Sequence, residues 1–166
     1  TYTREGENDF SFNWFYTMQG SFRYCFSPSK KLTLGIKGDA LFISNSDSIT
    51  AHDNFYLLGG IESVNRRSIP MIGFHANQIP VRNLAGLGIE ADFELLKDVH
   101  LSLSGSVFAI QEVERSTGLS LLFGYGLGAA YMSVIGPVKI GIMHGIYTEQ
   151  QYFKQVKGYI SIGYNF

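Results

Sequence analysis

Three carboxylates, Glu90, Asp92 and Glu94, occupy every second position of one segment. Residues two apart in a strand point to the same side, so these three would form a row. Such a row could carry general acid–base chemistry. It could also form a charge network inside a barrel, because enclosed charges need partners. The candidate partners are Arg66, Arg67 and Arg82. The network is the simpler interpretation, and we predict it.

The other residues that could do chemistry do not form a recognisable site. Gly124-x-Gly126-x-Gly128 has the spacing of a phosphate-binding loop, but such a loop must lead into a helix, and here the apolar alternation continues through it. We therefore expect packed glycines that face a lumen. No Gly-x-Ser-x-Gly nucleophile elbow occurs, and the four histidines lack metal-ligand spacing. The single cysteine, Cys25, is interpreted as a spectator thiol. We predict no catalytic residue, no metal and no cofactor.

The composition favours strands and a low-charge environment. Of the 166 residues, 16 % are charged and 14 % aromatic, and 19 are glycine. The charged share lies below the roughly 25 % of soluble domains. A net charge of −1 predicts no nucleic-acid partner. No apolar run is long enough for a spanning helix. The polar start, 1–9, shows no signal peptide, so we expect that one was removed or that the chain starts within a longer protein.

A period of two dominates the chain and predicts seven strands. Their alternating segments are 10–26, 32–42, 87–95, 99–107, 121–131, 138–146 and 160–166. A soluble sandwich also alternates, with its apolar face inward, whereas a membrane barrel turns that face to lipid. Three features favour the membrane. The apolar faces run for about ten residues without a charge, the opposite faces are mostly small or polar, and aromatics stand towards the strand ends.

The connections predict an orientation. Short turns follow the first, third and fifth strands, and longer polar loops follow the second, fourth and sixth; the longest loop spans about 44–82. Bacterial barrels place short turns in the periplasm, so Phe166 should end there. An eighth strand at 54–61 is the alternative, which would reverse the first two strands. Seven strands cannot close a barrel, so we expect the missing wall to come from upstream sequence or another protomer.

Several segments resemble one family of outer-membrane proteins. In the long loop, the run from Phe55 and Tyr56 through Gly59 and Gly60 to Val64 is similar to a motif of the outer-membrane assembly-factor barrels, the BamA and TamA type, also called bacterial surface antigens. The segment 124–139 resembles the penultimate hairpin of that family, and 158–166 resembles its closing strand. The resemblance covers nearly the whole chain and implies an all-β, antiparallel transmembrane β-barrel segment.

Two departures from the family pattern concern an ion pair between an Arg and an Asp that the family is known for. The family has Arg-Gly-Phe or Arg-Gly-Tyr after the valine, whereas Val64 is followed by Asn65, Arg66, Arg67 and Ser68. The Asp that the resemblance places two residues before Gly105 is Leu103. Both residues of this ion pair are absent, which argues against the assembly activity of the better-known members. The overall sequence is most similar to a branch in which the barrel follows a patatin-like phospholipase domain.

We therefore predict that residues 1–166 are the C-terminal part of an outer-membrane β-barrel that anchors a larger protein. The alternative is a barrel that inserts or translocates other proteins. The expected partners are outer-membrane lipid, the barrel assembly machinery and the remaining strands of the wall. The final strand should carry the insertion signal, which consists of Ile160, Ile162, Tyr164 and Phe166.

Overall fold

The computed structural model describes residues 15–45, 55–63, 65–113, 118–133, 136–148 and 156–163, and their regular structure is all β. Seven strands are long: β1 (Phe15–Ser29), β2 (Leu32–Asn45), β5 (Ile79–Leu96), β6 (Val99–Glu112), β7 (Ser120–Ser133), β8 (Gly136–Tyr147) and β9 (Val156–Ile162). Two are short: β3 (Tyr56–Leu58) and β4 (Ser68–Ile69). No helix in these residues is long and apolar enough to cross a membrane.

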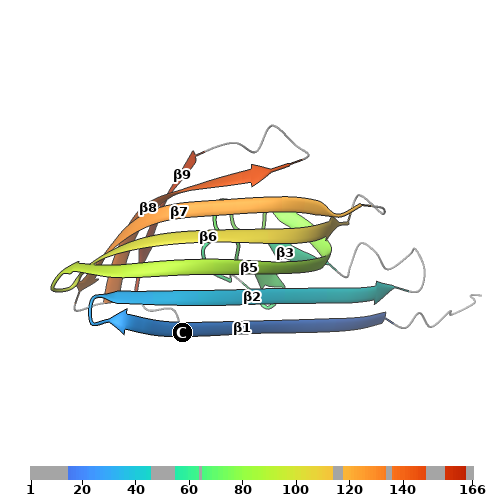
Figure 1. Cartoon of the computed structure of the whole chain (residues 1–166). Helices are drawn as coiled ribbons and strands as arrows, with labels where there is room; N and C mark the ends of the chain where they lie inside the picture. The colour runs from blue at the N-terminus through green and yellow to red at the C-terminus, as the bar shows by residue number, and fades with distance from the viewer. Residues whose placement is uncertain are drawn as a thin grey trace, which may run out of the picture.

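The long strands form one antiparallel sheet in the order β1-β2-β5-β6-β7-β8-β9 (Figure 1). This confirms the predicted antiparallel segment of seven strands. The alternative eighth strand at 54–61 is wrong, because β2 pairs directly with β5 and β3 contributes only a short ladder to the first residues of β5. Within the described residues, β1 and β9 do not pair with each other, so the sheet is open.

Tight turns join the hairpins at one end of the sheet, which we call the turn end. The β1–β2 hairpin turns at Lys30 and Lys31, and the β5–β6 hairpin turns at Lys97 and Asp98. Asp98 has a φ of 65°, a left-handed conformation that suits a two-residue hairpin turn. The opposite end, which we call the loop end, carries the longer connections (Figure 1).

The outer, convex face of the sheet is apolar, as the alternation predicts. Neighbouring strands align their outward side chains in register, for example Ile36 beside Ile89 and Leu103 beside Leu127. The outward side chains are those at the even positions of 16–26, 32–42, 138–146 and 156–162 and at the odd positions of 85–95, 99–109 and 121–131. None of these positions holds an Asp, Glu, Lys or Arg.

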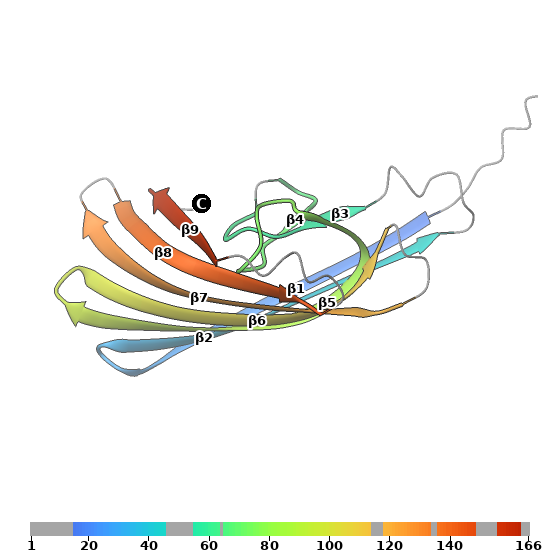
Figure 2. The same ribbon diagram turned by 90° about the horizontal axis from the view of Figure 1, so that it is seen from above.

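The long loop between β2 and β5 folds over the inner, concave face of the sheet (Figure 2). β3 pairs with Ile79–Val81 of β5 and runs parallel to β4. The regular wall extends further into this segment than the predicted bounds of about 44–82, because β2 continues to Asn45 and β5 already begins at Ile79. Apolar residues of the loop and of the loop end of the sheet form one buried core. It comprises Leu41, Ile43, Leu58, Ile69, Met71, Phe74, Ile79, Val81, Leu84, Phe108, Ile110, Leu122 and Tyr147.

Candidate functional site: the inner face of the sheet

The loop rests on a floor of glycines in β7 and β8. A Cβ added at Gly124 would overlap the carbonyl oxygen of Ile72, and one at Gly145 would meet the carbonyl oxygen of Gly73. Gly73 has a φ of 94°, which turns the loop at the point where it touches the sheet. Phe74, which is fully buried, follows this turn. The absence of side chains in the wall therefore allows the loop backbone to lie directly on the sheet.

The glycines with the spacing of a phosphate-binding loop share this packing role. Gly124, Gly126 and Gly128 are buried on the inner face of β7. The side chain of Ile72 covers Gly126, while the hydroxyl of Tyr159 lies where a Cβ of Gly128 would project. This confirms the prediction of packed, inward-facing glycines. The strand runs straight through them, with no helix to hold a phosphate.

The residues of the inserted-loop motif shape the loop rather than a reactive centre. Gly59 and Gly60 have φ values of 126° and 94°, and their N–H groups donate to the carbonyl oxygens of Ile69 and Phe74, respectively. Tyr56 packs against the buried core, and Phe55 is half-buried beside it in the chain. Val64 lies outside the described residues. Arg66 and Arg67 are exposed in the turn before β4.

Lys157 ties β9 to the loop. Its side chain points inward and the residue is only 8 % exposed. The ammonium donates to Oε1 of Gln78 at 3.1 Å and lies 5.7 Å from the ring centroid of Phe74. The same Gln78 oxygen accepts a hydrogen bond from the backbone N–H of His75. One amide therefore holds both the loop and the last described strand.

The turn end of the inner face is polar and carries the predicted row of carboxylates. Arg23 on β1 pairs with Glu90 on β5 at 3.1 Å, with side chains that are 67 % and 42 % exposed. β2 runs between these two strands, and its Gly35 is the register partner of Glu90. Arg23 itself stands opposite Lys37 on β2, so its guanidinium crosses that strand diagonally to reach Glu90.

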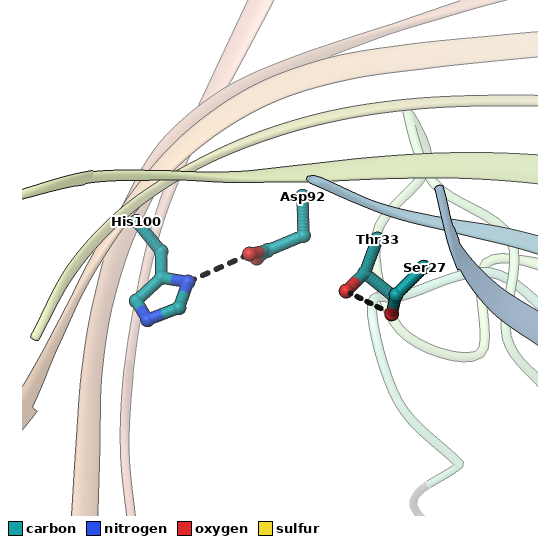
Figure 3. Close-up of polar contacts among 4 residues, drawn as sticks. All are labelled: Ser27, Thr33, Asp92 and His100. Carbon is teal, nitrogen blue, oxygen red and sulfur yellow. Dashed lines mark hydrogen bonds and ion pairs between the residues drawn. The ribbon is translucent and has the colours of Figure 1, made fainter. Parts of the chain in front are cut away.

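Asp92 has a different partner on the next strand. Nδ1 of His100 lies 2.7 Å from Oδ1 of Asp92, and the hydroxyls of Ser27 and Thr33 lie 3.0 Å apart near them (Figure 3). Glu94 is in register with His100.

The predicted pairing of this row with the loop arginines is therefore wrong for Glu90 and Asp92. The loop joins β5 at its first residues, Ile79–Val81, whereas the carboxylates stand at the turn end. Glu90 pairs with Arg23 and Asp92 with His100 instead, while Arg66 and Arg67 are exposed in the turn before β4.

A tyrosine of β9 bridges four strands at the turn end. The ring of Tyr159 covers Gly141 on β8, and its hydroxyl passes over Gly128 on β7 to hydrogen-bond with Ser102 on β6. The four residues share one register row across the sheet. The alternation puts Tyr159 on the inner face but could not predict the crossing, because the crossing depends on which glycines stand beside the tyrosine.

Sequence reasoning also missed the apolar part of the inner face. Inward residues of β6 change from His100, Ser102 and Ser104 to Phe108 and Ile110, both buried. The inward residues of β2 change in the same way, from Lys37 and Asp39 to Leu41 and Ile43. Both faces of these strands are apolar at the loop end. That loss of alternation was the available signal that something covers the inner face there.

The predicted insertion signal lies only partly in the described residues. Ile160 and Ile162 point outward from β9 and are 74 % and 65 % exposed. Tyr164 and Phe166 lie outside the described residues. The described residues hold no group of three or more His, Cys, Asp or Glu side chains that could bind a metal ion.

The inner face thus combines a packed end and a polar end behind an apolar outer face. No curated protein matches the chain. The family profile of the OMP85 superfamily matches residues 1–166, the whole chain. The chain therefore belongs to the OMP85 superfamily of outer-membrane β-barrels.

Proposed function

We propose that this chain is a lipid-facing wall of a larger outer-membrane β-barrel, that it anchors the protein in the membrane, and that the loop of residues 55–78 plugs its lumen. The observation that carries the proposal is the contrast between the two faces of the same strands. Outward positions hold no charged residue over the spans given above, while inward positions hold ion pairs at one end and a packed loop at the other. This is the pattern of a membrane barrel, not of a soluble sheet.

The open edges support a closing partner with an odd number of strands. Seven antiparallel strands make β1 and β9 run in the same direction. A barrel with antiparallel pairing throughout needs an even total, so the remaining wall must add an odd number. A second copy of this sheet adds seven but would pair β9 with a parallel β1. We therefore propose upstream sequence, rather than a copy of this chain, as the missing wall.

The connections support an orientation with the turn end in the periplasm, because short turns lie there in bacterial barrels. The C-terminal side of β9 would then be periplasmic. A Cys25→Ser protein with Lys30→Cys or Leu119→Cys tests this in intact cells. An impermeant thiol reagent should label position 119 and spare position 30, and the reverse labelling would overturn the orientation.

A pair of neighbouring substitutions tests the wall itself. Leu103 is 59 % exposed on the outer face, and Ser104 follows it on the inner face. A lysine in lipid costs about 2–4 kcal/mol near the membrane centre, so Leu103→Lys should sharply reduce the heat-resistant folded protein in outer membranes. Ser104→Lys should be tolerated, because it faces the polar side. If Leu103→Lys reaches the outer membrane and folds as well as Ser104→Lys, the proposal fails.

Two larger functions remain candidates for the full-length protein. We favour anchoring, and on the sequence resemblance we propose a patatin-like phospholipase domain as the anchored part. Membership of the OMP85 superfamily favours insertion or translocation of other proteins as the second candidate. The full reading frame separates them. A Gly-x-Ser-x-Gly motif upstream supports the hydrolase, and repeated periplasmic docking modules without it support translocation.

A further inference from the structure

The free edge of β9 needs a partner strand. Seven residues of β9 pair with β8, and within the described residues no strand pairs with its other side. Unpaired backbone N–H and C=O groups are not tolerated in hydrocarbon. Val156 and Ile160 are exposed on the outer face, which places this edge in the apolar layer. Another strand must therefore lie along β9 in the assembled protein.

Lys157 on this edge strand is a buried cation without an anion. Its two contacts, the Gln78 amide oxygen and the Phe74 ring, are neutral. The described residues contain no carboxylate within 4.0 Å of its ammonium. A buried charge is costly unless it is paired. The opposite edge differs, because Arg23 on β1 is more exposed than Lys157 and yet has Glu90 as its partner.

We infer that the strand that pairs with the free edge of β9 carries an aspartate or glutamate that faces the lumen beside Lys157. The inference rests on the proposed function, in which a further wall closes the sheet. Directly opposed residues of antiparallel strands have Cβ atoms about 4.5–5.5 Å apart, so a carboxylate there lies within reach of the lysine.

Charge complementarity argues that this strand is not β1 of a second copy. The inward side chains that β1 would offer are Thr17, Gln19, Ser21, Arg23 and Cys25. None is acidic, and Arg23 would add a second cation. A copy in the same orientation would also pair in parallel with β9. The partner is therefore a different strand, with apolar residues facing lipid and an acid facing inward.

Zero-length coupling in the full-length protein tests this. A carbodiimide joins an amine to a carboxylate that is in direct contact, and mass spectrometry then identifies the two peptides. We expect Lys157 to be coupled to an Asp or Glu at an inward position of the strand beside β9. Lys157→Arg keeps the charge but should lose the coupled product. Arg23→Lys is the positive control, because it places an amine beside Glu90.

Three results would overturn the inference. They are coupling of Lys157 to a carboxylate within residues 1–166, coupling to a second copy, and no coupling of Lys157 while Arg23→Lys reacts with Glu90. None of these would by itself refute the membrane wall, because Leu103→Lys and Ser104→Lys test that separately. If Leu103→Lys is tolerated, the proposed function fails whatever Lys157 contacts.

Discussion

The two ends of the inner face are built differently from the same alternating strands. At the loop end, Phe108 and Leu122 are buried under Phe74 and its neighbours in the apolar core. At the turn end, Arg23 and Glu90 form an ion pair that stays partly exposed. The outer face is apolar at both ends. The polarity of the inward side chains therefore matches what lies over them. They are apolar where packed protein covers the sheet and polar where the sheet faces a polar interior.

The largest difference should come from removing the side chain at the centre of the packed end. Phe74 is fully buried, so Phe74→Ala leaves a cavity and should lower the free energy of unfolding by about 3–5 kcal/mol. Phe93→Ala is the matched change on the outer face, where detergent fills the space and the loss should be smaller. Urea unfolding in detergent measures both. Equal losses would remove the distinction between the packed core and the lipid face.

A smaller effect should follow from filling the glycine floor. Gly124→Ala places a methyl group against the Ile72 carbonyl, and overpacking of this kind costs about 1–3 kcal/mol. The loop should also become more accessible to protease. Gly105→Ala on the outer face is the control, because its nearest neighbour is 3.7 Å away. If both variants protect the loop like the original protein, the loop does not rest on this floor.

The smallest effect should come from the turn end. Arg23 and Glu90 are largely solvated, and exposed ion pairs contribute about 0.2–1 kcal/mol, less at high salt. A double-mutant cycle of Arg23→Ala and Glu90→Ala should give a coupling energy in this range. A coupling of several kcal/mol would mean that the turn end is as tightly packed as the loop end.

The alternation of the sequence was sufficient to predict the strands, their faces and the turns, because a period of two alone decides which side a residue takes. It could not predict the partners of the charges. Arg23 stands opposite Lys37 and reaches Glu90 by crossing β2 diagonally, a contact between strands that no local pattern indicates. The position of the loop was equally hidden, since Ile72 and Phe74 meet glycines about 50 to 70 residues later in the chain, and long-range packing decides that contact.

Accessibility along one strand tests the central claim most directly. In a Cys25→Ser background, single spin labels are placed on β6 at Leu101, Ser102, Leu103, Ser104 and Phe108. We predict that oxygen dissolved in lipid reaches positions 101 and 103, that a water-soluble nickel chelate reaches 102 and 104, and that neither reaches 108. Access of the nickel chelate to 101 and 103 would contradict a lipid-facing wall, and its access to 108 would contradict a plugged lumen.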